Sequence, residues 1–379
     1  METLTDLHIT TYKQTTMEAT MNSSEVITAL LDKQIPDRMG LYEHFWPETL
    51  RDYWPDQGYP KDQSPETYFN YDIINCGGWF DTSPFMGIWE VIEESDEWYV
   101  AKDGRGASLK YWKKKSGTPE HIAFDLTGPD KWSKYREPLL ATDTARLGDM
   151  PAVKANLEKM KAEGRYTVFG NLFVFEAMRG TIGDQEFLPA LLTEPEWIHD
   201  YCEVHLDMYR RHYEILFREA GVPDGFFIYE DFGYNKGLFA SPRVMAEMIM
   251  PYEKQLVSFF KDYGMQVILH SCGDIREAIP LIIDAGFDCI QPMEAKAGCD
   301  VLDIAATYGR KIAYMGNINV VPLSSNNPAE VEAEILPKLS KLKEMRIPYI
   351  FHSDHSIPPD INLSTYEYAL NLLRDNWKY

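Results

Sequence analysis

From residue 140 onward, short apolar runs alternate with longer amphipathic segments. The apolar runs are continuous and lie at residues 166–170, 225–229, 266–269, 288–292, 311–316 and 349–352. Between them, residues 194–220, 242–263, 275–285 and 328–343 show apolar positions at helical spacing. A strand that is apolar on both faces is typical of a parallel sheet covered by helices. The pattern therefore predicts six strand–helix units of a parallel α/β fold.

The first 140 residues follow other patterns. Residues 24–33 are amphipathic and follow Asn22 and Ser23, either of which can cap a helix. Residues 41–60 are rich in Trp, Tyr and Pro and are expected to wrap the core irregularly, whereas residues 69–75 are a candidate strand. Residues 86–115 alternate apolar and polar positions and contain Asp103-Gly104, which predicts an inserted antiparallel hairpin.

Six units with one or two earlier strands fit a single (β/α)8 barrel of the TIM type. A doubly wound open sheet is the alternative, but its Gly-x-Gly-x-x-Gly loop is missing from a strand–turn–helix setting. We predict an N-terminal helical and irregular extension over residues 1–65, packed on a barrel over residues 66–379.

Composition narrows the class of protein. The chain has 379 residues, is 45% hydrophobic and carries a formal net charge of -22, which disfavours nucleic acid and anionic membranes as partners. No apolar run approaches the roughly 20 residues of a membrane span. Five scattered cysteines argue against a disulfide scaffold, and the acidic N-terminus does not resemble a secretory signal. We expect a cytoplasmic protein with reduced thiols.

Polar residues gather where the predicted strands end, which is where β/α barrels place their chemistry. Three of the nine histidines fall at two of these ends. This clustering favours a metal site over buried structural residues. The residues concerned are Glu230, Asp231, His270, Cys272, Glu294, Asn317, Asn319, His352, Asp354 and His355.

His270 and Cys272 follow an apolar strand two positions apart, so their side chains point the same way. An imidazole and a thiolate are suitable zinc ligands, although an isolated His-x-Cys is more often structural. With His355 they form a set of three ligands that leaves a fourth position open, as a catalytic zinc requires.

Other assignments within this cluster remain open. His352 could replace His355, and Glu230 could supply an oxygen ligand or act as an acid or base. Cys299 is a weaker alternative ligand. Asp274 and Asp354 could orient the imidazoles or cap turns.

A series of motifs resembles the uroporphyrinogen decarboxylase superfamily, which includes corrinoid-linked methyltransferases. Residues 36–38 (Pro-Asp-Arg) and 45–48 (Phe-Trp-Pro-Glu) are similar to its methyltransferase-like branch. The motifs are Tyr229-Glu-Asp-Phe-Gly with Ser241-Pro242, Pro251-Tyr252, His270-Ser-Cys-Gly-Asp, Tyr314-Met-Gly-Asn-Ile, and Ile357-Pro-Pro with Asn362.

Two departures from the family distinguish its branches. The decarboxylase carries an Arg-Gln-Ala-Gly-Arg segment for its acidic substrate, whereas residues 41–48 here are acidic and aromatic. Zinc methyltransferases of the coenzyme M type carry a second cysteine in a Gly-Cys-x-x-Pro-Pro-like segment, where this chain has Asp354-His355-Ser-Ile-Pro-Pro. A site with one thiolate is a stronger Lewis acid, which suits an ether or alcohol oxygen better than a thiol.

The resemblance implies a Zn2+-dependent methyltransferase of the O-demethylase type. It would move a methyl group from a methoxylated, aromatic donor to the cob(I)alamin of a separate corrinoid protein. Metal ligands would be His270, Cys272 and His355, and catalytic residues would be Glu230, Asp231 and Asn317. Substrate would contact Trp79, Phe80, Phe173, Phe175, Glu294 and His352.

Three alternatives remain open from the sequence. The first is methyl transfer from a methyl-corrinoid to tetrahydrofolate or a thiol. The second is a metal-free decarboxylase that acts on a smaller acid. The third is a non-catalytic partner subunit that keeps the barrel, which the dense polar set at the strand ends disfavours.

Overall fold

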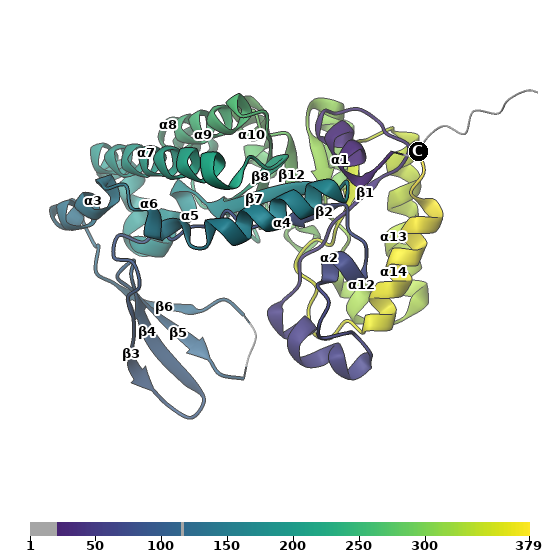
Figure 1. The fold of residues 1–379 in the computed structure, drawn as a ribbon, viewed down its shortest axis with the longest axis horizontal. Helices are drawn as coiled ribbons and strands as arrows, with labels where there is room; N and C mark the ends of the chain where they lie inside the picture. Colours follow the sequence, from purple (N-terminus) through teal and green to yellow (C-terminus); the bar gives the residue numbers. More distant parts are fainter. Residues whose placement is uncertain (1–20, 115–116) are drawn as a thin grey trace, which may run out of the picture.

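Eight parallel strands form a nearly closed barrel with helices around it (Figure 1), which confirms the predicted TIM-type fold. The structure is a computed structural model and describes residues 21–114 and 117–379. Neighbouring strands follow the order β1-β14-β13-β12-β11-β8-β7-β2. The strands are β1 (Gly40–Leu41), β2 (Ile73–Asn75), β7 (Tyr166–Leu172), β8 (Gly225–Tyr229), β11 (Gln266–Ser271), β12 (Cys289–Pro292), β13 (Ala313–Met315) and β14 (Tyr349–Phe351).

A side chain joins the first and second strands of the barrel. The backbone N–H of Asp72 donates to the carbonyl of Leu41, and the N–H of Leu41 donates to the Asp72 carboxylate, each at 2.9 Å. Arg38 holds that carboxylate at 2.6 Å. Strand β1 lies at the edge of the stretch that we expected to be irregular. The sequence did not predict this strand, because two paired residues leave no periodic pattern.

Helices cover the outside of the barrel. Helix α1 (Ser23–Leu31) begins at the predicted cap, Asn22, which forms a capping box with Glu25. The predicted helix over 242–263 is divided into α8 (Pro242–Met248) and α9 (Met250–Asp262), since Pro251 suits a first turn and not a helix interior. The others are α2 (Pro65–Tyr68), α3 (Trp132–Leu140), α4 (Met150–Ala162), α5 (Val174–Thr181), α6 (Asp184–Thr193), α7 (Pro195–Ala220), α10 (Ile279–Ala285), α11 (Val301–Tyr308), α12 (Val320–Ser324), α13 (Pro328–Glu344) and α14 (Leu363–Asn376).

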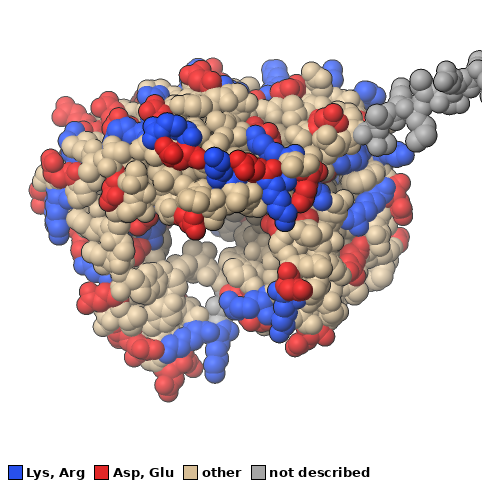
Figure 2. All heavy atoms as spheres, in the orientation of Figure 1, with Lys and Arg blue, Asp and Glu red and all other residues tan. Residues whose placement is uncertain are grey.

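An antiparallel sheet of four strands is inserted after β2. The prediction of a hairpin is confirmed and extended, because β3 (Trp89–Glu94), β4 (Trp98–Asp103), β5 (Ala107–Trp112) and β6 (Glu120–Phe124) pair in sequence order. The sheet projects from the end of the barrel (Figure 1), and a space-filling view shows a hollow between it and the rest of the molecule (Figure 2). A loop that follows a barrel strand lies on the side where barrel enzymes hold their active sites.

Across the described parts of the chain, we find no helix with the length and apolar character that a membrane span requires.

Candidate active site at the barrel mouth

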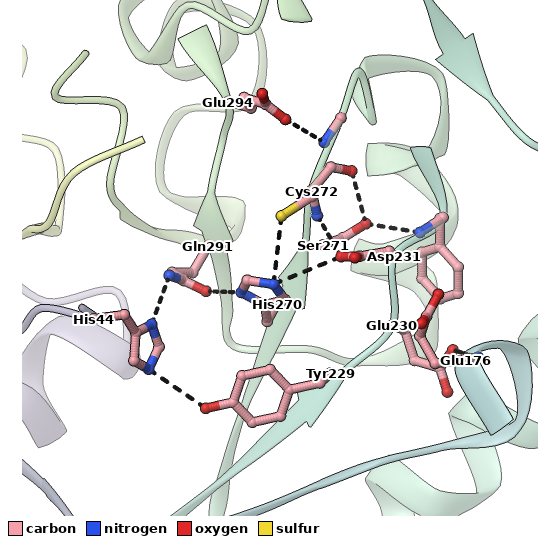
Figure 3. Close-up of polar contacts among 12 residues, drawn as sticks. His44, Glu176, Tyr229, Glu230, Asp231, His270, Ser271, Cys272, Gln291 and Glu294 are labelled. Atoms are coloured by element: carbon pink, nitrogen blue, oxygen red, sulfur yellow. Dashed lines mark hydrogen bonds and ion pairs between the residues drawn. The ribbon is translucent and has the colours of Figure 1, made fainter. Parts of the chain in front are cut away.

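Three potential metal ligands converge where β8 and β11 end side by side (Figure 3). The imidazole Nε2 of His270 lies 3.5 Å from Cys272 Sγ and 3.6 Å from Asp231 Oδ1. One donor atom from each residue lies within 4.8 Å of the others, and all three side chains are partly accessible. The backbone N–H of Cys272 also donates to Asp231 Oδ1 at 2.8 Å, which ties the two strand ends together.

The chemistry of these three donors fits a divalent cation such as zinc. Burial, followed by the carboxylates of Asp231 and Glu294, raises the pKa of the Cys272 thiol. A thiol in this setting keeps its proton until a cation compensates the negative charge, and metal coordination supplies that compensation. A nitrogen, a sulfur and a carboxylate oxygen are all common zinc ligands.

The predicted third ligand, His355, is not part of this group among the described residues. Its ring stacks on Trp46, with 5.6 Å between ring centroids. His352, the alternative, is fully buried and bonds to Ser353 O through Nδ1 at 2.6 Å. The structure therefore brings Asp231, a predicted catalytic residue, to the place where His355 was expected as the third ligand.

Glu230 and Asp231 are neighbours that turn in different directions (Figure 3). Glu230 is fully buried, and its carboxylate accepts the N–H groups of Phe175 and Glu176 at the start of α5, at 3.2 and 2.8 Å. Its carboxylate oxygens are thus engaged inside the protein. Glu176 lines a cavity together with Asp231.

The remaining polar candidates make contacts that organise loops. The side-chain amide of Asn317 donates to the carbonyls of Met293 and Cys299 at 2.7 Å each, and its oxygen accepts from Val301 N. Glu294 accepts the N–H of Gly273 at 2.9 Å. Other contacts of this kind join Asp354 to the N–H groups of Val320 and Ala295, Asp274 to Arg276, Asn319 to Val321 N, and Cys299 Sγ to Gly273 O.

Of the four aromatic residues predicted to wall the pocket, Trp79 is the exposed one. It is 53% exposed, and its ring lies 5.6 Å from that of Tyr229. Phe173 packs on Tyr209, and Phe175 packs on Phe232, both inside the core. The ring of Phe80 is also buried, although the residue lines a cavity of about 310 Å³ with Trp79.

A larger cavity of about 520 Å³ separates the inserted sheet from the barrel mouth. Asp231 belongs both to this cavity and to the group of metal donors, so the cavity opens onto the candidate metal site. Its arginines are ion-paired: Arg105 lies 2.6 Å from Asp103, and Arg179 lies 2.5 Å from Glu176. The inserted sheet and its loops contribute Arg105, Leu109, Tyr111, Thr118, Pro119 and His121, and the barrel side contributes Leu172, Glu176, Arg179, Gly180, Asp184 and Asp231.

Sequence reasoning missed His44 and Gln291, which lie next to His270. Gln291 Oε1 is 2.6 Å from His270 Nδ1, and His44 Nδ1 is 3.4 Å from Gln291 Nε2. His44 follows strand β1, which the sequence did not predict. Without a predicted strand before it, His44 could not be recognised as a residue at a strand end. Gln291 lies on β12 opposite His270 in the ladder, so pairing the predicted strands in register could have found it.

The similarity to one solved structure agrees with this architecture. A methyltransferase from Methanosarcina mazei is similar in fold, with a TM-score of 0.63 and 14% identity over 94% of this chain and 98% of that one. A 3-keto-D-glucoside 4-epimerase from E. coli matches with a TM-score of 0.36 and 11% identity, covering 60% of this chain and 84% of that one. A D-psicose 3-epimerase matches with a TM-score of 0.33 and 11% identity, covering 63% and 85%.

No curated protein matches the sequence. The family model described as uroporphyrinogen decarboxylase matches residues 152–375, more than half of the chain. The chain therefore belongs to the uroporphyrinogen decarboxylase family.

Proposed function

We propose that this protein is a zinc-dependent methyltransferase that moves a methyl group from a methoxylated aromatic donor to the cob(I)alamin of a corrinoid protein. The observation that carries the proposal is the convergence of Asp231 Oδ1, His270 Nε2 and Cys272 Sγ at the barrel mouth. Family membership and the similar fold of a methyltransferase support it. The reaction takes place between two proteins, with the corrinoid protein docked over the mouth.

His270, Cys272 and Asp231 would hold the zinc. When bound, zinc acts as a Lewis acid that makes the donor oxygen a better leaving group. One thiolate among the three ligands leaves the metal more electrophilic than two would, which suits oxygen leaving groups.

The cavity beside Asp231 would hold the organic part of the methyl donor. Its volume of about 520 Å³ lies within the ordinary range for small-molecule sites. Tyr111 and Leu109 of the inserted sheet offer an apolar wall for an aromatic ring. These residues replace the buried Phe173 and Phe175 as the contacts we propose for the donor.

Glu176 is our candidate for donating a proton to the departing oxygen. Burial and the carboxylates of Asp231 and Asp184 raise its pKa to about 7, although Arg179 opposes the shift. A carboxyl group with a pKa near the working pH is an effective general acid. It lines the cavity, whereas Glu230 is enclosed in the core.

The test combines metal analysis with a methyl-transfer assay. Purified protein should contain about one zinc per chain. With added cob(I)alamin and methoxylated arenes, it should form methyl-cobalamin, which absorption spectroscopy follows. Asp231→Asn should lower zinc affinity about 10- to 100-fold or more, and Glu176→Gln should slow turnover while leaving zinc content unchanged.

His355→Ala is the matched variant, because sequence reasoning assigned the third ligand position to His355. Normal zinc affinity in this variant would support Asp231 as the ligand. Loss of zinc in His355→Ala, together with normal zinc affinity in Asp231→Asn, would instead support His355 as the third ligand. Protein without zinc, or turnover only from methyl-cobalamin to tetrahydrofolate or a thiol, would contradict the proposal.

A further inference from the structure

A chain of hydrogen bonds beneath the metal donors links His270 to a buried backbone carbonyl. It runs from Ser353 O through His352 and Gln291 to His270, at 2.6, 3.1 and 2.6 Å in turn. Figure 3 shows the last link of this chain, in which the Gln291 amide oxygen faces His270, and a side contact from the amide nitrogen to His44. His352 and Gln291 are buried, so water does not compete for these bonds.

The first link fixes the tautomer of His352. Its Nδ1 faces the carbonyl oxygen of Ser353, which can only accept a hydrogen bond, so Nδ1 carries the proton. Glu43 Oε1 also lies 3.3 Å from this nitrogen. Burial lowers the pKa of His352 to about 3, which keeps the ring neutral. The other ring nitrogen, Nε2, is therefore an acceptor.

The second link fixes the orientation of the Gln291 amide. An acceptor at His352 Nε2 favours the amide nitrogen of Gln291 at that end, 3.1 Å away. His44 Nδ1 lies 3.4 Å from the same amide nitrogen and 3.2 Å from His352 Nε2, and the two hydrogens of the amide can donate to both rings. The amide oxygen then faces His270 Nδ1 at 2.6 Å. The flipped amide would place two acceptors against each other at the His352 end, and burial makes an unmade bond costly.

The third link concerns His270 itself. Because Gln291 Oε1 can only accept, His270 Nδ1 carries the proton, and the lone pair is on Nε2. That nitrogen is the one facing Cys272 Sγ and Asp231 Oδ1. The opposite tautomer would set the Nδ1 lone pair against an oxygen at 2.6 Å.

We propose that Gln291 is a positioning residue that selects the metal-binding tautomer and ring orientation of His270 before any metal binds, and that His352 holds Gln291 in turn. The proposal rests on the proposed function for the identity of the metal site. The tautomer itself requires neither a metal nor a methyl acceptor.

Histidine-selective 15N NMR of the metal-free protein tests the tautomer directly. At about pH 9, where imidazoles are neutral, two-bond 15N–1H correlations separate the two tautomers. The His270 signals are those missing in His270→Ala. We expect the Nδ1–H form in the wild type and a shift toward Nε2–H in Gln291→Met, which keeps side-chain length and removes the bonds. Zinc affinity, measured by competition with a chromophoric chelator, should fall about 10- to 100-fold in that variant.

Two further variants control the interpretation. Gln291→Glu retains an acceptor for His270 Nδ1 and should keep the Nδ1–H form, although it loses the donor that faces His352 Nε2. The tautomer of the wild type is measured without any Gln291 variant, which covers the case in which Gln291→Met fails to fold. Gln266→Met makes the same replacement at the start of β11, far from the mouth, and should change neither readout. An Nε2–H tautomer in the wild type would overturn the proposal, as would wild-type tautomer and zinc affinity in Gln291→Met. A wild type with the Nδ1–H form but without methyl transfer would overturn the proposed function alone.

Discussion

The ends of β8 and β11 and the end of β14 carry the same kinds of residue but use them differently. At β8 and β11, the donor atoms of Asp231, His270 and Cys272 converge and remain partly accessible. After β14, His352 and Asp354 are fully buried, and each already has internal partners. A histidine or an aspartate at a strand end therefore indicates a reactive site only when its donor atoms converge and remain accessible.

The difference arises from what covers each strand end. The loop after β14 packs against the segment after β1, where Glu43 accepts hydrogen bonds from the backbone and hydroxyl of Ser353. The end of β8 instead faces the cavity beneath the inserted sheet through Asp231, which bonds to Cys272 at the end of β11. Buried polar groups must find partners inside the protein, whereas groups beside a cavity can bind a ligand.

The largest expected effect is the loss of zinc in His270→Ala. Removing one of three ligands should weaken binding by several kcal/mol, on the order of a hundred-fold or more. The matched control is His199→Ala, a partly exposed histidine on α7 whose Nδ1 contacts Tyr252 at 2.9 Å. Chelator competition measures both variants. Equal zinc affinity in the two variants would mean that His270 does not bind the metal. The ends of β8 and β11 would then not differ from the end of β14 as a metal site.

The second effect is a pH dependence of stability from the buried region after β14. Burial raises the pKa of Glu43 from its ordinary value of 4.5 to about 8, although bonds from Ser353 oppose the shift. Between these values the unfolded chain ionises Glu43 while the folded chain keeps the proton, so stability falls as pH rises. The contribution is about 1.4 kcal/mol per pH unit at most.

Glu43→Gln should remove this part of the pH dependence. Urea unfolding at about pH 5 and about pH 8 should show a smaller difference for the variant than for the wild type, by a few kcal/mol. Zinc affinity should stay within a small factor of wild type. An unchanged pH profile would mean that Glu43 is ionised in the folded state.

Asp354→Asn should destabilise the protein without removing zinc. The Asp354 carboxylate accepts from Val320 N at 2.9 Å and from Ala295 N at 3.1 Å, which joins two loops. Asparagine retains one acceptor and places an amide group against the other N–H, at a cost of about 1–3 kcal/mol. Urea unfolding measures the loss, and zinc binding is the control. A variant that lost zinc but not stability would place Asp354 with the metal donors.

The sequence predicted the barrel because six of its strands are continuous apolar runs with helical segments between them. It did not reveal β1, which has two residues and is joined to β2 through the side chain of Asp72. His44, three residues after that strand, was missed for the same reason. A periodic pattern can be recognised only over several residues. A hydrogen bond from a single side chain, such as that of Asp72, leaves no such pattern.

Within the site, alternation along β11 predicted that His270 and Cys272 share a face, and their donor atoms do lie 3.5 Å apart. The third metal donor beside this pair depends on the direction in which the side chains point after each strand ends. Glu230 and Asp231 are adjacent in sequence, yet one caps α5 and the other faces the mouth. Loop geometry and the helix that follows decide this, and neither leaves a periodic signal.

The smallest expected effect concerns His355, the residue on which sequence and geometry differ. Its ring stacks on Trp46 with an interplanar angle of 23° and a centroid distance of 5.6 Å. His355→Ala should therefore cost about 0.5–1.5 kcal/mol of stability, the usual contribution of an aromatic pair. Trp46→Ala should remove the same contact, so the double variant should lose less than the sum of the single losses. Additive losses would mean that the two rings do not interact, which would leave the His355 ring available as a metal ligand.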